Sequence, residues 1–424
     1  MNILMTTNTY LPHVGGVAKS VAAFTDQLRA MGHRVIVIAP EHNHAQLTEL
    51  DVLRVPAIQN FNGSDFAMII PLPKFLESQL KSFRPDIIHS HHPFLIGNTA
   101  LRLSKKYNSP LVYTQHTMFE QYTHYTPIGS PKMKHFVVAL STGYANLANR
   151  VIAPSESVAR ILTHRRIQTP IEVVPTGIDI QKFANGSGRH IRLQNNIPPN
   201  AFVAGTVGRL APEKNLDFLT KAAIAFLKQN KIAHFLIAGY GPSEPQIKQS
   251  FHNENLSGRV HFLGKLEDQQ LIDTYHALDC FIFSSKSETQ GLVLTEAMAA
   301  GLPVIALDAP GVREVLKNDL NGFLLDYDQI EDFAHALLTL SHLPQEKRKS
   351  LSENAIKTAS SFSIQSCTSK LLTVYQTALD NKSPDHSKNE ELNWRKSIDQ
   401  IKAEWDIITN FTSAVTDAIS KDKT

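Results

Sequence analysis

The sequence predicts an α/β protein with two doubly wound parallel sheets and a helical tail. Short apolar runs alternate with amphipathic helical patterns over residues 1–380, which is typical of parallel strands joined by right-handed crossovers. The 424 residues are too many for one ordinary core. A polar stretch rich in turn formers, residues 184–200, divides the alternation into two series. We therefore expect domains at 1–183 and 201–380, a linker at 184–200, and a polar linker with a helical tail at 381–424; the last helices before residue 380 are candidates to cross back to the first domain.

The first series opens with a glycine loop between a strand and a helix. Strands are expected at 2–6, 35–39, 86–89, 111–114, 151–154 and 171–174, with helices at 17–31 and 94–107. Gly15 and Gly16 precede the first helix, where glycine lets the backbone approach a ligand that a side chain would block. The absence of GxGxxG argues against a dinucleotide fingerprint. A paired glycine is also common in plain turns, so both interpretations remain open.

An apolar stripe in residues 72–83 also has two interpretations. Leu72, Phe75, Leu76, Leu80 and Phe83 recur at helical spacing, with Lys74, Lys81 and Arg84 beside them. A basic amphipathic helix of this kind could lie on an anionic membrane. Packing of the stripe on the sheet is the more common outcome for a stripe by itself. Residues 132–138, where Lys132, Lys134 and His135 precede an apolar run, are a second candidate for membrane contact.

A cluster of polar and aromatic residues follows the strand expected at 111–114. His116 stands at the carboxyl end of that strand, where a parallel sheet presents groups to a ligand. Glu120, Tyr122 and His124 follow it and suggest the wall of an acceptor site. A metal site is the rival use of four histidines, His89, His91, His92 and His116. No cysteine or carboxylate completes a familiar ligand spacing, so no metal is expected there.

The second series places cations where its first strand ends. Strands are expected at 202–207, 234–238, 259–263, 279–283 and 303–306. Arg209 and Lys214 flank a proline turn after the first of them, where they could clamp a diphosphate, Arg as a fork and Lys as a point charge. A surface pair with Glu213 is the alternative. Gly239 and Gly241 form another glycine loop that opens a helix.

Two carboxylates follow the strand expected at 279–283. Glu288 lies in a short loop that closes with Gly291, and Glu296 lies one to two turns into the next helix. Unpaired amides and the dipole at the start of such a helix favour phosphate. Carboxylates are poor phosphate ligands but good hydroxyl acceptors. A ligand with both phosphate and sugar, such as a nucleotide sugar, satisfies both conditions.

Composition excludes several classes of protein. The 42 basic and 39 acidic residues leave a net charge of only +3, and no basic block or recognition module favours nucleic acid. The two cysteines, Cys280 and Cys367, have neither a metal-like nor a redox-like spacing. We expect a cytoplasmic protein, because no leader pattern precedes the first strand and no apolar run reaches the length of a membrane span.

The tail carries a narrow apolar stripe at spacings of three and four. Its members are Trp394, Ile398, Ile401, Trp405, Ile408, Phe411, Val415 and Ile419. Such a helix could form a homodimer, dock back on the body of the protein or lie on lipid, and the sequence does not choose among these.

In combination, these motifs resemble the retaining glycosyltransferases of family 4, whose GT-B fold has two facing Rossmann-like domains with a cleft between them. The resemblance covers residues 1 to about 379 and depends on the first glycine loop, HTMFEQYTHY, GRLAPEK, the loop at 239–242 and ETQGLVLTEAMAAGLPV. The last phrase, with HHPFLIG, is similar to the subgroup that glycosylates diacylglycerol at a membrane surface. Phosphatidylinositol mannosyltransferases are the neighbouring subgroup.

The resemblance implies a role for each candidate residue. It places Glu288 on the hydroxyls of the donor sugar, Glu296 on the ribose and His116 beside the transferred sugar. Arg209 and Lys214 would hold the diphosphate. The remaining donor-binding positions are Gly15, Gly16, Gly241, Thr289, Gln290, Gly291 and Leu292.

The expected function is transfer of a hexose from a nucleotide sugar, UDP-glucose, to a lipid hydroxyl, that of 1,2-diacylglycerol. The resemblance implies retention of configuration and an enzyme on the cytosolic face of an anionic membrane. No cofactor is expected, and no metal, because no DxD segment is evident. A GDP-mannose donor and a soluble or sugar acceptor are alternatives, and a nucleotide-sugar epimerase or a non-catalytic binding protein is the alternative from another class.

Overall fold

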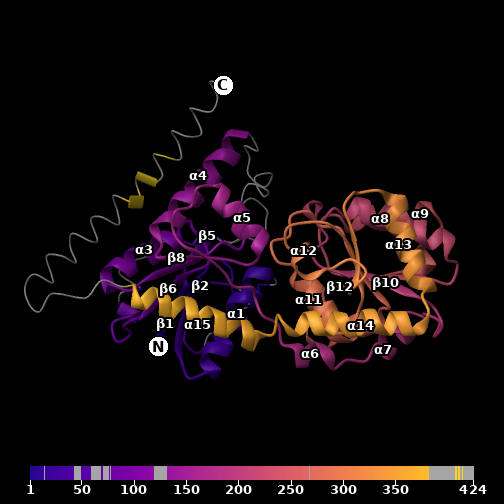
Figure 1. Cartoon of the computed structure of the whole chain (residues 1–424), viewed down its shortest axis with the longest axis horizontal. Coiled ribbons are helices and arrows are strands. Elements are labelled where there is room, and N and C mark those ends of the chain that lie inside the picture. The colour runs from indigo at the N-terminus through magenta and orange to yellow at the C-terminus, as the bar shows by residue number, and fades with distance from the viewer. Residues whose placement is uncertain are drawn as a thin grey trace, which may run out of the picture. The chain divides into compact units, whose positions relative to one another are not determined.

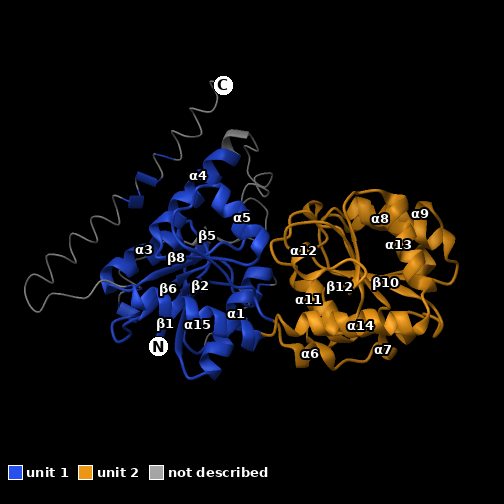
Figure 2. Cartoon of the chain, viewed as in Figure 1, with its two compact units in different colours: residues 1–177, 364–424 blue, residues 178–363 orange. Residues whose placement is uncertain are grey.

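The structure is a computed structural model that describes residues 1–13, 15–42, 49–58, 68–69, 76, 78–118, 131–266, 268–381, 406–407, 409–410 and 413. The chain divides into two compact units. Unit 1 holds Met1–Gly177 together with the chain from Ile364 onward, and unit 2 holds Ile178–Ser363 (Figure 2). The chain therefore leaves unit 1 once and returns to it once.

Unit 1 is organised around a seven-stranded parallel sheet in the order β3-β2-β1-β6-β7-β8-β9. Its strands are β1 (Asn2–Thr6), β2 (Arg34–Pro40), β3 (Val52–Val55), β6 (Ile87–Ser90), β7 (Leu111–Thr114), β8 (Arg150–Ala153) and β9 (Ile171–Val173). A separate antiparallel pair joins β4 (Ala57–Ile58) to β5 (Met68–Ile69). β1 pairs with β2 on one side and β6 on the other, so the strand order reverses between β1 and β6. β3 was not predicted.

The helices of unit 1 cover both faces of this sheet. They are α1 (Gly16–Ala30), α3 (Ile96–Tyr107), α4 (Pro131–Leu147), α5 (Glu156–His164) and α15 (Ile364–Asp380) (Figure 1). Alternate residues of β1 point to opposite faces. Ile3 and Met5 pack in the core that α1 and α15 cover, and Leu4 packs in the core that α3 and α4 cover. The return of α15 to unit 1 confirms the crossover expected before residue 380.

The stripe at 72–83 packs inside unit 1. Leu76, Leu80 and Phe83 are almost fully buried in the core beneath α3. Leu72 and Phe75, with Lys74, lie outside the described residues. For the described members the membrane interpretation is wrong, because their apolar side chains gain more from the core than a surface position would give.

Unit 2 repeats the plan with a six-stranded parallel sheet in the order β12-β11-β10-β13-β14-β15. Its strands are β10 (Val203–Val207), β11 (His234–Ala238), β12 (Val260–Gly264), β13 (Cys280–Phe283), β14 (Val304–Leu307) and β15 (Gly322–Leu325). β10 pairs with β11 and β13, so the order reverses between β10 and β13. β15 was not predicted.

Two layers of helices cover the sheet of unit 2. One core lies under α8 (Leu216–Gln229), α9 (Glu244–Asn253) and α13 (Ile330–His342). The other lies under α10 (Asp268–Ala277), α11 (Leu292–Ala299) and α14 (Gln345–Ser360). The shorter elements are α6 (Ile180–Ala184), α7 (Arg189–Gln194), α12 (Val312–Val315) and the 3-10 turns η3 (Pro212–Lys214) and η4 (Ser257–Arg259).

The predicted linker at 184–200 is wrong, because these residues are part of unit 2. Ile191 and Ile197 are buried in its core with Phe183. The guanidinium of Arg192 donates to the Asp279 carboxylate at 2.8 Å. Spaced apolar anchors fold this segment onto the sheet in spite of its polar composition, and the boundary falls after Gly177.

The described part of the tail docks on unit 1. Ile407 packs against the core of that unit, and the Asn410 amide donates to the Leu140 carbonyl of α4 at 3.1 Å. The stripe residues Trp394, Ile398, Ile401, Trp405, Ile408, Phe411, Val415 and Ile419 lie outside the described residues. Docking back on the body is thus favoured for the described residues, and a homodimer through the tail stays a prediction.

Candidate active site

Within each unit by itself, candidate residues lie near the point where the strand order of its sheet reverses. In unit 2, Arg209 and Lys214 follow β10, and Glu288 follows the neighbouring strand β13. In unit 1, Gly15 and Gly16 follow β1, while His91 follows the neighbouring strand β6. The carboxyl ends of parallel strands at such a reversal open a crevice for ligands. These candidate residues lie at strand exits, as expected, and their contact with a ligand stays a prediction.

Lys214 and Glu288 form an ion pair at the edge of unit 2. The Lys214 ammonium lies 3.2 Å from Glu288 Oε2, and both side chains are mostly buried. The Gly291 amide donates to Glu288 Oε1 at 3.2 Å. Burial raises the pKa of the Glu288 carboxyl, but the Lys214 charge and the amides of Gly291 and Gln290 lower it more, so the pKa lies below its usual value. Lys214 thus forms an ion pair with Glu288.

Serine hydroxyls fasten the two loops that carry this pair. Ser284 Oγ donates to the carbonyls of Lys214 and Asn215, each at 3.0 Å. Ser285 and Ser287 donate to the Glu213 carbonyl at 3.3 and 3.2 Å. Sequence reasoning missed these contacts, although the run SSKS directly after a strand was a signal for them. The proline turn η3 is thus held against the loop of Glu288 by side chains that carry no charge.

Arg209 lies at the carboxyl end of β10 beside the second glycine loop. The Leu210 amide donates to the Tyr240 carbonyl at 2.9 Å, and the Ser243 amide donates to the Leu210 carbonyl at 2.9 Å. Gly241 has φ 155°, and a Cβ there would overlap the Leu210 carbonyl. Only glycine lets the loop come this close to β10. Arg209 and Gly241 are therefore brought together at this edge, and Arg209 is partly exposed.

The residues Thr289, Gln290 and Gly291 lead into α11, which begins at Leu292. Gly291 is its N-cap in the left-handed conformation, with φ 81°, and no side chain of Gly291 can cap the helix. The Gly311 amide donates to the Glu288 carbonyl at 3.0 Å and supports the loop from behind. The helix therefore begins beside the Lys214–Glu288 pair, where its amide donors add to the positive potential.

Glu296 lies in the middle of α11 and is almost fully buried. Its Oε2 accepts a hydrogen bond from the Tyr275 hydroxyl of α10 at 2.8 Å. Burial and then the Glu296 charge raise the pKa of Tyr275 well above its usual value, so the hydroxyl stays protonated as the donor. Tyr275 was not predicted, because its contact with Glu296 depends on how α10 packs against α11.

In unit 1, His116 makes a hydrogen bond with another histidine. His91 Nδ1 lies 2.9 Å from His116 Nε2. His89 Nδ1 bonds to the Tyr375 hydroxyl of α15 and His89 Nε2 to the Thr114 hydroxyl, both at 2.7 Å. No pattern in the sequence predicted the role of Tyr375, which is 286 residues from its partner. Glu120, Tyr122 and His124, the predicted acceptor-side residues, lie outside the described residues.

These histidines are neutral at physiological pH. Burial lowers the pKa of His89 to about 3, that of His92 to about 3 and that of His116 to about 4, and the neighbouring His116 lowers the first two further. The Asn8 amide donates to His92 Nδ1 at 3.1 Å, which a protonated ring could not accept. In the part of the chain that the structure describes, no group of His, Cys, Asp and Glu side chains could hold a metal ion.

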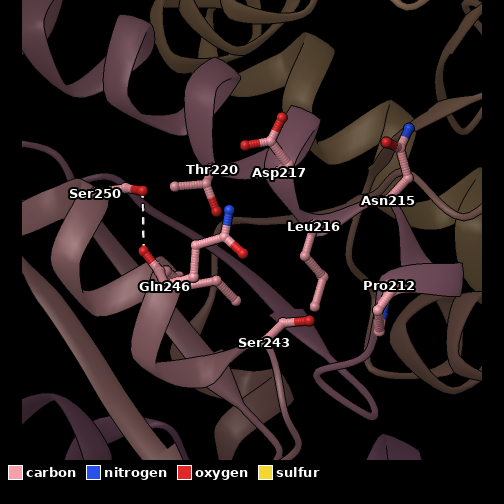
Figure 3. Close-up of a pocket in the computed structure, with 9 residues that line it drawn as sticks. Pro212, Asn215, Leu216, Asp217, Thr220, Ser243, Gln246 and Ser250 are labelled. Atoms are coloured by element: carbon pink, nitrogen blue, oxygen red, sulfur yellow. Dashed lines mark hydrogen bonds between the residues drawn. The ribbon is translucent and has the colours of Figure 1, made fainter.

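A cavity of about 190 Å³ adjoins the proline turn on the side of α8 and α9 (Figure 3). It is lined by Pro212, Asn215, Leu216, Asp217, Thr220, Ser243, Gln246, Ile247 and Ser250. The Ser250 hydroxyl donates to the Gln246 carbonyl at 2.9 Å (Figure 3). Its one ionisable lining residue is the acidic Asp217, and Lys214 and Glu288 are not among the lining residues, so the cavity does not suit a diphosphate.

Comparisons with known proteins identify the family of this chain. The family description "Glycosyl transferases group 1" matches residues 189–358, and "Glycosyltransferase Family 4" matches residues 14–182. The first region lies in unit 2, and nearly all of the second lies in unit 1. The protein is therefore a glycosyltransferase with two Rossmann-like units. It belongs to glycosyltransferase family 4, as the motifs indicated.

Curated relatives and solved structures agree with this assignment. The alpha-monoglucosyldiacylglycerol synthase of Streptococcus pneumoniae is 29% identical over 83% of this chain and 81% of that protein. The GDP-mannose-dependent alpha-mannosyltransferase of Mycobacterium tuberculosis is 28% identical over 82% of this chain and 89% of that protein. The sucrose-phosphate synthase of Thermosynechococcus elongatus has a TM-score of 0.73 at 20% identity and covers 89% of this chain and 99% of its own. The first two support the predicted subgroup, and the third supports the GT-B fold.

Proposed function

We propose that the protein transfers glucose from UDP-glucose to the hydroxyl of 1,2-diacylglycerol with retention of configuration. The ion pair of Lys214 with Glu288 at the reversal of the unit 2 sheet is the observation that carries this proposal. It places a cation and a hydroxyl acceptor side by side at the start of α11. Those are the two kinds of group that a nucleotide sugar requires, one for its diphosphate and one for its sugar.

The chemistry follows from where charge develops. Breaking the bond between C1 of the sugar and the diphosphate oxygen leaves negative charge on that oxygen and positive character on the sugar ring. Lys214, Arg209 and the first amides of α11 supply positive potential to the leaving oxygen before the reaction begins. The acceptor oxygen forms the new bond to C1, and its proton passes to the departing phosphate, which implies attack on the same face of the sugar.

The donor must break the ion pair between Lys214 and Glu288 when it binds. Lys214 is neutralised by Glu288, whose pKa is lowered by that contact. When a diphosphate approaches the ammonium, Glu288 is released from the cation and can accept hydrogen bonds from sugar hydroxyls. Binding of the diphosphate to Lys214 thus also makes Glu288 available to the sugar. A nucleotide without a sugar would take the cation from Glu288 and supply no hydroxyl in its place.

The lipid acceptor is supported by the names of the relatives. Two of them, from Streptococcus pneumoniae and Acholeplasma laidlawii, are alpha-monoglucosyldiacylglycerol synthases. A solved Anabaena structure of the same fold, in complex with UDP-glucose, makes that nucleotide sugar the first donor to test. GDP-mannose is the second donor, because mannosyltransferases are nearly as similar to this chain.

We place the contact with an anionic, cytosolic membrane surface on α4. Lys134 and His135 are exposed there, and Phe136, Val137 and Val138 are partly exposed. No helix in the described residues is long and apolar enough to span a bilayer. Replacing Lys134 by Glu and Val137 by Asp should reduce sedimentation with phosphatidylglycerol vesicles, because a basic rim and an apolar face both contribute to surface binding. Unchanged sedimentation would contradict this placement.

The proposal is tested with purified protein, labelled nucleotide sugars and diacylglycerol in vesicles. Label from UDP-glucose should enter the organic phase as a glucolipid, and proton NMR of the product should show the α-anomer. We expect the same rate after treatment with EDTA, because cations of the chain stabilise the leaving group. Label that stays in the aqueous phase would exclude the lipid acceptor, and release of UDP without any transfer would exclude a transferase.

A further inference from the structure

Two imidazoles at the ligand edge of unit 1 make a direct hydrogen bond. His91 Nδ1 lies 2.9 Å from His116 Nε2, with the ring centroids 5.2 Å apart and 25° between the ring planes. The parallel register of β6 and β7, which sets Ser90 beside Tyr113, brings the two following loops together. The contact is therefore a product of the sheet and does not depend on a distant segment.

The hydrogen bond couples the proton positions of the two rings. A neutral imidazole has one N–H and one bare nitrogen, and a bond between two nitrogens needs one of each. If His91 Nδ1 donates, His116 Nε2 is bare and the proton of His116 is on Nδ1. If His116 Nε2 donates, His91 Nδ1 is bare and its proton is on Nε2. In either case both rings carry the same tautomer. If the two rings carried different tautomers, two N–H groups or two lone pairs would face each other between His91 Nδ1 and His116 Nε2.

The surroundings keep this pair neutral and in place. His91 is almost fully buried. Burial, and then the neighbouring histidines, lower the pKa of His91 well below its usual value, and burial lowers the pKa of His116 to about 4. His91 Nε2 has no hydrogen-bond partner among the described residues. The polar contact that orients the His91 ring is thus its bond to His116, and the His89 ring packs against it with 4.0 Å between centroids.

We propose that His91 is a positioning residue for His116, and that it fixes the orientation of that ring and couples the tautomer of His116 to its own. The effect on catalysis rests on the proposed function, in which His116 lies beside the transferred sugar. A change of tautomer or a ring flip would exchange donor for acceptor at the nitrogen that meets a sugar hydroxyl. With His91 in place, a flip of the His116 ring or a change of its tautomer alone breaks a buried hydrogen bond, so the two rings can change tautomer only together.

The first test measures tautomers and does not use turnover. Protein labelled with 15N-histidine is examined at pH 7 by long-range proton–nitrogen NMR, and the two rings are assigned from the spectra of His91→Asn and His116→Ala. Both rings should be neutral and of the same tautomer. A mixed pair of tautomers, or a charged ring, would overturn the inference.

The second test uses two substitutions that keep different parts of the ring. Asn can place an amide where Nδ1 of His91 stands, and Gln can place one where Nε2 stands. His91→Asn should keep kcat within about threefold of wild type, while His91→Gln should lower kcat about tenfold and leave KM for UDP-glucose almost unchanged. In a His116→Ala background, adding His91→Gln should cause no further loss. Equal losses in both backgrounds would show that His91 does not act through His116.

Unit 2 offers a matched control for burial. His234 Nδ1 lies 2.9 Å from His261 Nε2, also with stacked rings 5.2 Å apart, but near the amino ends of β11 and β12. His234→Gln should lower the unfolding temperature and leave kcat unchanged, and a loss of kcat equal to that of His91→Gln would overturn the inference. If the wild-type protein transfers no sugar, the proposed function fails, and the tautomer measurement still decides this inference.

Discussion

The ligand edges of the two units follow the same plan but satisfy their polar groups differently. In unit 2 the charged side chains pair with one another, Lys214 with Glu288, and serine hydroxyls bond to the carbonyls of the loops. In unit 1 the ends of β1 and β6 hold buried polar atoms that have no partner among the described residues. They are Thr6 Oγ1, Asn8 Oδ1, Thr9 Oγ1 and His91 Nε2. In the described part of unit 2, no buried side-chain polar atom is without a partner.

The difference shows how each unit limits the free-energy cost of burying polar groups at its ligand edge. A buried charge without a partner costs far more than a buried neutral group without one. Unit 2 carries charges at its edge, so they must be paired before a ligand arrives. Unit 1 carries neutral histidines and hydroxyls, which tolerate a missing hydrogen bond. We therefore expect a ligand to exchange hydrogen-bond and ion-pair partners in unit 2 and to supply missing hydrogen bonds in unit 1.

Low pH should destabilise unit 1 more than unit 2, and this is the largest effect that we expect. A histidine whose pKa is lowered by folding binds fewer protons in the folded state, so its stabilising contribution is present above about pH 6.5 and is lost as the pH falls toward the folded pKa. Each such residue changes the free energy of unfolding by about 1.4 kcal/mol per pH unit in that window. Unit 1 has His89, His91, His92 and His116, together with the less buried His33, and unit 2 has His234 and His261.

Unit 1 should therefore unfold at a higher pH than unit 2. Hydrogen exchange with mass spectrometry between pH 7 and pH 4 would resolve peptides from each unit. Glu288 acts later, because a carboxyl with a lowered pKa loses its contribution only below its usual value of 4.5. Simultaneous loss of protection in both units, or earlier loss in unit 2, would contradict the contrast between a neutral and a charged edge.

Removing the cation of unit 2 should have the next largest effect. Lys214→Ala should lower kcat by about a hundredfold or more, the range for a lost group that stabilises developing charge. The variant also leaves Glu288 without its cation, so the pKa of Glu288 should rise. Lys286→Ala is the control, because Lys286 lies in the loop that carries Glu288 and forms an exposed pair with Asp328. Turnover of Lys214→Ala within twofold of wild type would contradict its role at the diphosphate.

Glu296 tests whether a buried carboxylate of unit 2 also meets the ligand. Glu296→Ala should weaken nucleotide binding about tenfold, as the loss of a charged hydrogen-bond acceptor predicts. Tyr275→Phe is the matched variant, because it removes the hydroxyl that donates to Glu296 and keeps the carboxylate. It should weaken binding less. Nucleotide affinity of wild-type strength in Glu296→Ala, measured by calorimetry, would mean that Glu296 serves only as the partner of Tyr275.

The smallest effect concerns the histidine network of unit 1. Tyr375→Phe removes the hydroxyl at 2.7 Å from His89 Nδ1 and should lower the stability of unit 1 by about 1 kcal/mol. Urea unfolding followed by hydrogen exchange would measure this change for each unit. Tyr327→Phe, at an exposed position in unit 2, is the control. A loss of stability in unit 2, with unit 1 unchanged, would show that α15 does not stabilise unit 1.

The sequence predicted the central strands and one edge strand of each sheet, and it missed the other edge strand of each sheet, β3 and β15. The strands at 111–114 and 234–238 were predicted with the bounds that the structure has, because every residue in them is buried and the run is apolar. β3 and β15 lie at sheet edges and are only partly buried, so their apolar signal is weak. The linker at 184–200 was wrong because composition was weighed above the spacing of the buried residues Ile191 and Ile197.

The sequence predicted those site residues that closely follow a strand, and it did not predict partners brought together by helix packing. Lys214 and Glu288 each lie a few residues after one of two adjacent strands, so the alternation of strands and helices was enough to bring them together. Tyr275 and Tyr375 reach their partners through helix packing, over separations of 21 and 286 residues. Neither separation leaves a periodic signal. The partners of His116 and Glu296 could therefore be named only from the structure.

The departure of the chain at Gly177 and its return at Ile364 also set an order for synthesis on the ribosome. Cys367, Leu371 and Tyr375 fill the core of unit 1 but are translated after the whole of unit 2. A nascent chain that ends at Ser363 can complete unit 2, while unit 1 still exposes the apolar surface that α15 covers. The N-terminal half of this protein is thus the last to mature.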